Sequence, residues 1–222
     1  LEEFGNRYPD KYPDNAKDVL LQMGQQALKR SGFAEEKQAF WRPKYVKMVD
    51  WIVSNETEYR REISKIHNEV WGRFFIENIP GGKFEIYAKA DRLDETLDGK
   101  INIIDYKTGR ARTASEVKNG YAPQLPIEGL IAAAGGFENI KKADVNSLMY
   151  WKLGDKIIRI DDGIDNILSQ TKQHISEVIN LFDFETTGYL SRPNPKNVPE
   201  YSDYEHLARV KEWSVQEEED DE

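Results

Sequence analysis

Two apolar segments joined by a tight-turn signal constrain the fold more than any other feature of this chain. Residues 84–90 (F-E-I-Y-A-K-A) and residues 101–106 (I-N-I-I-D-Y) each favour a β-strand by their apolar and β-branched content. Asp98 and Gly99 stand between them, and an Asp-Gly pair between two such segments favours a hairpin. We therefore expect two antiparallel neighbours in one sheet.

Three charged side chains are attached to these segments. Asp91 follows the first, and Asp105 and Lys107 end the second. Residues two apart on a strand point to the same face, so Asp105 and Lys107 share one, and the hairpin brings Asp91 near Asp105. Two carboxylates hold a hard cation such as Mg²⁺, and a nearby lysine can orient a water. Most isolated Asp-x-Lys pairs are solvated surface charges, but this context favours metal-dependent phosphodiester hydrolysis.

A helix is expected directly after the charged strand. Residues 122–134 carry Pro123 at the start, which suits a first turn, and then become strongly apolar. The segment should therefore pack on the sheet. Gln124 and Glu128 are four residues apart and share one face of this helix.

The ordered motifs A-D-R-L-D, D-Y-K-T-G and G-Y-A-P-Q-L-P-I-E-G resemble the PD-(D/E)xK nuclease superfamily in its RecB-like branch. Within that branch the chain most resembles the C-terminal nuclease domain of AddB, a subunit of the AddAB helicase–nuclease, in its alphaproteobacterial type. The resemblance covers most of the chain and is densest over residues 84–137. Residues 204–213 also resemble the terminal segment of that family.

The resemblance implies a role for each motif residue. Asp91 and Asp105 would be the two metal-binding carboxylates, and the backbone carbonyl of Tyr106 a further ligand. Lys107 would position the hydrolytic water and stabilise negative charge. Gln124 would help shape the DNA-facing side of the site.

Two departures from the family pattern stand out. Position 128 is Glu where RecB-like nucleases carry Tyr, which fits the AddB type but leaves the role of Glu128 open between a functional residue and a polar helix position. The opening residues L-E-E-F resemble the end of a motif whose histidine completes the metal site, so that histidine is expected three residues before Leu1. The chain contains no cysteine, so we expect no iron–sulfur cluster of the kind that some AddB proteins hold.

The histidines that are present look structural. His67 belongs to a strand-like stretch before the hairpin, His174 to an amphipathic helix and His206 to the C-terminal region. Glu69, on the same stretch as His67, is expected to support the site rather than to bind the metal.

The charge distribution is compatible with a DNA partner. The net charge is −9, but residues 217–222 are all acidic, and without these six carboxylates the net charge is −3. Arg110, Arg112 and Lys118 follow the candidate site and would contact phosphates independently of sequence. The alternative is a solvated basic loop.

The remaining segments look like scaffold. Helices are expected over residues 15–30 and 35–64, strands over 145–151 and 156–160, and an amphipathic helix over 161–184. Along the second helix Trp41, Tyr45, Met48 and Trp51 recur at helical spacing, so this aromatic stripe is expected in the core rather than as a base-stacking surface.

Together these features predict an α/β restriction-endonuclease-like fold, a mixed sheet flanked by helices. The resemblance implies a Mg²⁺-dependent DNA nuclease, with Mn²⁺ as a substitute, that cleaves single-stranded DNA as an exonuclease in double-strand break repair by recombination. Its partners would be DNA and an AddA-like helicase–nuclease subunit. An inactive DNA-binding or assembly module of the same fold, or a stand-alone exonuclease, is the alternative.

With no apolar run long enough to span a membrane, we expect a cytoplasmic protein. The expected organisation is a helical part of the nuclease domain (1–65), an α/β nuclease core with its C-terminal helix (66–190), an extended segment (191–216) and an acidic disordered tail (217–222).

Overall fold

The computed structural model describes residues 1–8, 12–190 and 207. The chain divides into two compact units, Leu1–Asn180 and Leu181–Glu222, and the description below concerns the first. Apart from residue 207, the predicted extended segment and the acidic tail lie outside the described residues. The same holds for His206 and for the rest of residues 204–213. The domain organisation expected from the sequence therefore stays a prediction.

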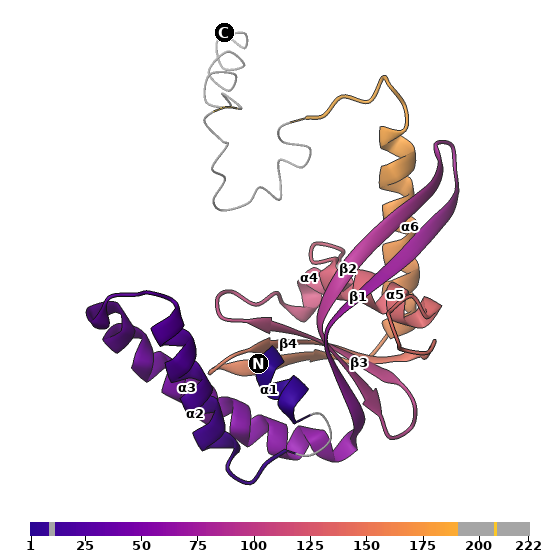
Figure 1. The fold of residues 1–222 in the computed structure, drawn as a ribbon. Helices are drawn as coiled ribbons and strands as arrows, with labels where there is room; N and C mark the ends of the chain where they lie inside the picture. Colours follow the sequence, from indigo (N-terminus) through magenta and orange to yellow (C-terminus); the bar gives the residue numbers. More distant parts are fainter. Residues whose placement is uncertain (9–11, 191–206, 208–222) are drawn as a thin grey trace. The chain divides into compact units, whose positions relative to one another are not determined.

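The first unit is built around a five-stranded sheet in the order β1-β2-β3-β4-β5 (Figure 1). Every neighbouring pair is antiparallel except β3 and β4, which are parallel. A parallel pair needs a crossover, and two helices between β3 and β4 supply it. This mixed sheet flanked by helices confirms the predicted α/β restriction-endonuclease-like fold class. The strands are β1 (Ile63–Ile79), β2 (Gly82–Thr96), β3 (Ile101–Lys107), β4 (Val145–Lys152) and β5 (Lys156–Ile160), and the crossover helices are α4 (Ala114–Lys118) and α5 (Gln124–Ala134).

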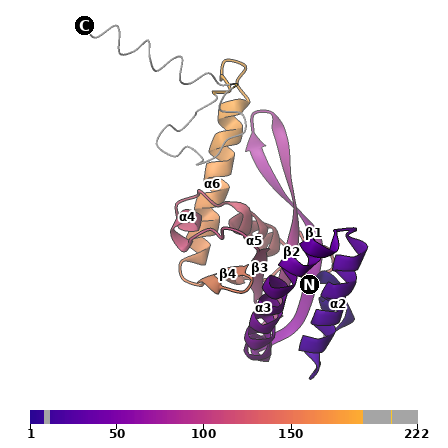
Figure 2. The ribbon, with the colours of Figure 1, turned by 90° about the vertical axis from the view of Figure 1, so that its left-hand side faces the viewer.

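Helices cover opposite faces of the sheet, as Figures 1 and 2 show from two sides. On one face α5 and α6 (Ile164–Phe182) pack on alternate strand residues, among them Leu93, Ile103 and Leu148. On the other face Ile104, Met149 and Trp151 pack against aromatic residues of α3 (Glu35–Tyr59). The period-two alternation of the strands therefore gives the sheet two separate cores.

The N-terminal residues form α1 (Glu2–Arg7), α2 (Ala16–Arg30), α3 and a 3-10 turn (Arg60–Glu62). Leu20 of α2 packs with Val49 and Ile52 of α3 in a third core. The first predicted helix is confirmed. The second ends at Tyr59 rather than at residue 64, because β1 begins at Ile63.

The predicted hairpin is confirmed, with its turn at Gly99, whose φ is +82°. The predicted strands at 145–151 and 156–160 and the helix at 161–184 are also present, as β4, β5 and α6. The sequence did not indicate that β2 also pairs with the preceding strand in a longer hairpin, which turns at Gly82. As a consequence, Asp91 lies within a long strand and not at its end.

Candidate active site

Asp91 lies where the sheet ladder breaks on both sides of its strand. The β2–β3 pairing ends at Arg92 opposite Ile104, and the next residues in that register are Asp91 and Asp105. Beyond this point the backbone N–H of Tyr106 donates to the side chain of Asp91, at 3.0 Å from Oδ2, and not to a backbone carbonyl of β2. The strands thus separate at the position where the two carboxylates face each other.

On its other side Asp91 faces Glu69 of β1. The β1–β2 pairing runs through Asn68 opposite Arg92 and Val70 opposite Ala90, and it omits the pair between them. Glu69 has a φ of +55°, a left-handed conformation that few non-glycine residues adopt and that concentrates at functional sites. Its carboxylate pairs with Lys89 at 2.5 Å. Glu69 therefore shapes the backbone next to Asp91 while its side chain is neutralised by a lysine.

Asp105 is buried and contacts both other predicted site residues. The Nζ atom of Lys107 donates to Asp105 Oδ1 at 2.9 Å, and the amide nitrogen of Gln124 donates to the same oxygen at 2.5 Å. Lys107 Nζ also lies 2.7 Å from Oδ2, but this contact lacks hydrogen-bond geometry, so Oδ2 has no donor among the described residues. The structure therefore brings Asp91, Asp105, Lys107 and Gln124 together, as the sequence predicted.

Glu128 adds a carboxyl group that the sequence left without a role. It is buried, one turn along α5 from Gln124, whose amide donates to Oε1 at 3.3 Å. Its Oε2 has no hydrogen-bond partner among the described residues. Burial, with the nearby charges of Asp105 and Asp91, raises the pKa of Glu128 to about 8. Burial also raises the pKa of Asp105, although the Lys107 ammonium opposes that shift.

The residues present fit a hard divalent cation. Asp105 Oδ2 is a buried carboxylate oxygen without a donor, and Asp91 offers a second carboxylate across the ladder break. Within the described part of the chain no three side chains of metal-binding type are grouped as a closed site. Mg²⁺ is typically held by one or two carboxylates and keeps several waters, so two carboxylates suffice for it. Metal binding by the Tyr106 carbonyl stays a prediction.

The predicted DNA-contacting residues lie just beyond β3, but each already has a partner. Arg110 and Arg112 both lie 3.2 Å from Glu116, and Lys118 lies 2.9 Å from Asp162. Arg110 and Arg112 share the one carboxylate of Glu116, so these three cations and their two carboxylate partners keep one positive charge. A role in phosphate binding stays a prediction.

The two histidines in the described part of the chain contact residues other than Asp91 and Asp105. His67 Nε2 is 2.7 Å from Glu95 Oε1 on β2. His174 belongs to α6, where its ring lies close to Gly120.

Sequence reasoning missed a buried ion network on the face of the sheet that α3 covers. Arg92, adjacent to Asp91, is fully buried, and its Nε donates to both carboxylate oxygens of Asp94, at 2.8 and 2.9 Å. The guanidinium also pairs with Glu56 of α3 and donates to the Tyr106 hydroxyl at 3.0 Å. The one available signal was charge at alternate positions, 92 and 94, of a strand whose neighbours are apolar.

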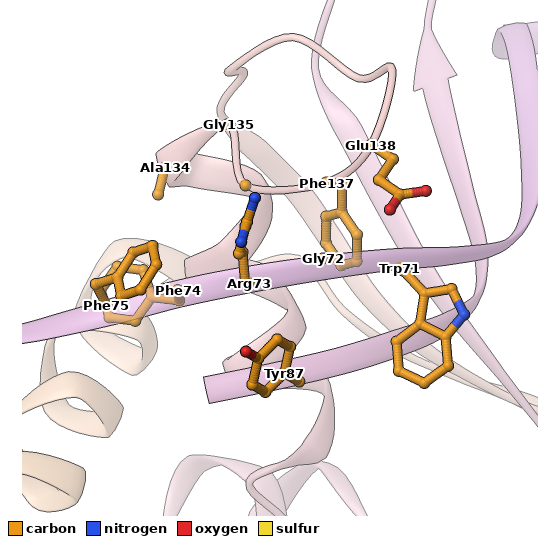
Figure 3. A pocket seen from close by; sticks show the side chains of 11 residues that line it. Trp71, Gly72, Arg73, Phe74, Phe75, Tyr87, Ala134, Gly135, Phe137 and Glu138 are labelled. Carbon is orange, nitrogen blue, oxygen red and sulfur yellow. The ribbon is translucent and has the colours of Figure 1, made fainter. Parts of the chain in front are cut away.

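A large pocket lies away from the carboxylates. Its volume is about 820 Å³, and it opens between β1 and the loop after α5 (Figure 3). Trp71, Arg73 and Tyr87 form part of its wall, and residues 134–138 form the other side. None of the predicted site residues lines it, so this pocket is not where we place the chemistry.

The comparisons with known proteins agree with this geometry. A family model described as the PD-(D/E)XK nuclease superfamily matches residues 1–211, and the chain belongs to that superfamily. Superfamily membership indicates nuclease activity. It does not by itself establish the relationship to AddB.

Sequence relatives come from Rickettsia. An uncharacterized protein of Rickettsia bellii is 30% identical over 62% of this chain and 16% of that protein. One of Rickettsia felis is 26% identical over 94% of this chain and 29% of that protein. The chain thus spans less than a third of the length of these curated relatives.

The crystal structure of SSO0001 superimposes with a TM-score of 0.33 and 14% identity, over 73% of this chain and 85% of that chain. This likeness is too low to carry an argument.

In the described part of the chain, no helix has the length and apolar content needed to cross a bilayer.

Proposed function

We propose that this chain is the Mg²⁺-dependent nuclease domain of an AddB-like helicase–nuclease subunit, and that it hydrolyses phosphodiester bonds of single-stranded DNA in recombinational repair. The observation that carries the proposal is the meeting of Asp91 and Asp105 where the β2–β3 ladder ends, with Lys107 bound to Asp105. Carboxylates and an ammonium converging at one point suit phosphoryl chemistry. The motif order along the chain supports the AddB-like assignment.

Asp91 and Asp105 would hold the cation. When bound, Mg²⁺ supplies Lewis-acid polarisation of the phosphate and lowers the pKa of a bound water. The ladder break separates the strands at these residues, and the buried Oδ2 of Asp105 has no hydrogen-bond donor there, with the Lys107 ammonium 2.7 Å away.

The protein's own residues then position the water and the phosphate. Lys107 is partly exposed and its ammonium lies beside Asp105, so it can orient the attacking water and stabilise charge on the phosphate. Gln124 donates to Asp105 and accepts from Lys107 at 3.4 Å, which holds the two groups in one arrangement. Glu128 receives the second hydrogen of that amide and fixes its orientation.

A cleavage assay on fluorescent oligonucleotides tests the proposal. We expect the purified protein to degrade single-stranded DNA in Mg²⁺ or Mn²⁺, to be inactive in EDTA, and to leave duplex DNA largely intact. Asp105→Asn and Lys107→Met should each abolish cleavage, because one removes a metal-binding carboxylate and the other removes the ammonium. Lys141→Met, an exposed lysine on the loop after α5, is the matched control and should cleave at the wild-type rate.

Full activity of the Asp105→Asn variant would contradict the site assignment. Equal cleavage of single strands and duplexes would contradict the single-strand preference while leaving the nuclease assignment intact.

A second candidate, an inactive DNA-binding or assembly module, is favoured by one observation. Among the described residues no group of three metal-binding side chains is arranged to hold a metal ion. Titration calorimetry with Mn²⁺ separates the candidates, because an inactive module predicts no binding that depends on Asp91 or Asp105.

A further inference from the structure

The N-terminal half of α3 carries a continuous row of aromatic and basic side chains. Positions 37, 40, 41, 44 and 47 recur at intervals of three or four residues, so they lie on one face of the helix. Phe33, just before the helix, lies under Lys37, whose Nζ is 4.4 Å from the Phe33 ring centre. We call this row the aromatic–cation stripe, and it consists of Phe33, Lys37, Phe40, Trp41, Lys44 and Lys47.

The aromatic members of the stripe are exposed. Phe40 is 62% exposed, and Trp41 and Phe33 are each 40% exposed. The prediction that Trp41 belongs to the core is therefore wrong, because the face of α3 that packs on α2 is the one carrying Tyr45 and Val49. Exposed aromatic residues grouped on one surface typically mark a binding site.

Among the residues that the structure describes, the basic members of the stripe have no carboxylate partner. Between Lys29 and Lys47 there are six cations and two carboxylates, a local charge of +4 in a chain of net charge −9. Among the described residues no carboxylate oxygen lies within 4 Å of any of these six cations. Arg110, Arg112 and Lys118 beside the active site, in contrast, all have carboxylate partners. The positive charge of the aromatic–cation stripe therefore favours an anionic partner.

The spacing between cations and rings fits a particular polyanion. Lys44 Nζ lies 4.4 Å from the Phe40 ring centre and 5.0 Å from that of Trp41. A nucleotide of a single strand offers a free base face for stacking and a phosphate within a few ångströms of it. A duplex hides its base faces inside the helix, so it can use the cations but not the rings.

The stripe also leads toward the candidate active site. Met48, one turn beyond Lys44, packs over Gly154 in the β4–β5 turn, and Trp51 Nε1 donates to Asp155 O in the same turn at 3.2 Å. The adjacent Leu153 N–H donates to the carbonyl of Lys107 at 2.9 Å. The α3 helix therefore meets the sheet at the edge where β3 ends with the catalytic lysine.

We infer that the aromatic–cation stripe binds single-stranded nucleic acid and holds it at the edge of the sheet that carries Lys107. Bases stack on Phe40 and Trp41, and Lys37, Lys44 and Lys47 contact phosphates. This inference rests on the proposed function for its orientation toward the site, but the binding itself requires neither metal nor cleavage.

Fluorescence anisotropy with a labelled twenty-nucleotide oligo(dT), in EDTA so that no cleavage occurs, tests the inference on the whole chain. Phe40→Ala/Trp41→Ala should weaken binding roughly tenfold or more, since stacking of a base on an aromatic ring contributes appreciably to affinity. Lys37→Gln/Lys44→Gln/Lys47→Gln should lower the slope of log affinity against log salt by about 2, since each phosphate contact on a single strand accounts for about 0.7.

Matched variants away from the stripe control for general effects. Phe84→Ala/Phe184→Ala removes two other exposed aromatic residues, and Lys65→Gln/Lys141→Gln/Lys156→Gln removes three other exposed lysines. Both controls should bind oligo(dT) within twofold of the wild type. Photocrosslinking of an iodouridine oligonucleotide, followed by peptide mapping, should identify residues 33–47 in the unaltered protein.

Wild-type affinity in the Phe40→Ala/Trp41→Ala variant, or crosslinks confined to other peptides, would overturn the inference. Tighter binding to a duplex of equal length would overturn it too, because a duplex leaves the rings unused. A protein that binds through the stripe but cleaves nothing in Mg²⁺ would refute the proposed function alone, so the two failures are distinguishable.

Discussion

Buried charged groups occur on both faces of the β2–β3 pair, and the two faces differ in how fully these groups are paired. On the face covered by α3, the guanidinium of Arg92 contacts Glu56, Asp94 and the Tyr106 hydroxyl. On the face covered by α5, Asp105 Oδ2 and Glu128 Oε2 have no hydrogen-bond donor among the described residues. A buried polar atom without a partner costs folding free energy. The charges on the α3 face are thus fully paired, whereas two carboxyl oxygens on the α5 face lack a hydrogen-bond donor, although the Lys107 ammonium lies 2.7 Å from Asp105 Oδ2.

The pKa directions show the same contrast. Burial favours the neutral form of Glu56, but Arg92 and Arg60 outweigh burial, so the pKa of Glu56 is lowered. For Glu128 burial dominates, and its pKa rises to about 8. A carboxyl group that is neutral at pH 7 in the free protein ionises readily only if a cation approaches.

The largest expected effect is loss of catalysis without loss of stability at Asp105. We expect Asp105→Asn to reduce cleavage by about 100- to 1000-fold or more, because the cation would lose one of the two carboxylates that would hold it. Its free energy of unfolding should stay within about 1 kcal/mol of the wild type, since the isosteric amide removes a poorly compensated buried charge. Steady-state cleavage and urea unfolding measure the two quantities. A large loss of stability in this variant would remove the distinction between the faces.

The opposite pattern is expected at Arg92. Arg92→Met leaves Glu56 and Asp94 as buried carboxylates without their guanidinium, so unfolding free energy should fall by about 3–5 kcal/mol. Replacing Arg92 and Asp94 together with apolar residues of similar size should recover much of this loss, because Glu56 keeps its ion pair with Arg60. Both variants are compared by urea unfolding. If Arg92→Met is as stable as the wild type, the network does not hold α3 to the sheet.

An effect of similar size should appear in the pH dependence of stability. Because the pKa of Glu128 is about 8 in the folded protein and its ordinary value is 4.5, the folded state retains a proton that the unfolded chain loses between these values. Stability of the wild type should therefore fall as pH rises from about 5 to 8, by up to about 1.4 kcal/mol per pH unit from this group alone.

Glu128→Gln isolates this contribution, because the amide cannot ionise. Measured in EDTA by urea unfolding at pH 5, 6.5 and 8, the stability gain of Glu128→Gln over the wild type should increase with pH. A constant difference between the two proteins would mean that Glu128 does not have a raised pKa.

The smallest effect is expected for exposed charges. Lys118 and Asp162 lie 2.9 Å apart with much of both side chains in water. A double-mutant cycle with Lys118→Ala and Asp162→Ala should give a coupling free energy below about 1 kcal/mol, and less in high salt. A value near that of the Arg92 network would mean that burial is not what separates the two kinds of ion pair.

Much of the site was accessible from sequence because its geometry is local. Asp105 and Lys107 are two residues apart on a strand, the turn at Gly99 sets the hairpin, and Gln124 opens the next helix. The conformation of Glu69 could not be predicted in this way, since its left-handed backbone depends on the pairing of β1 with β2. The prediction that Trp41 lies in the core was wrong for a similar reason. Helical spacing places Trp41 and Tyr45 on nearby faces but does not indicate which of the two faces α2 covers.

The sequence by itself determined the order of the strands and longer helices, though not the short helices α1 and α4, together with the hairpin between the two carboxylates. These follow from periodicity and turn chemistry, which act over a few neighbouring residues. Only the tertiary structure decided that Arg92 is neutralised by a helix 36 residues away, that Glu128 is left partly unpartnered, and that Arg110 and Lys118 are already paired. Burial and charge pairing depend on which surfaces meet, and that is a property of the whole fold.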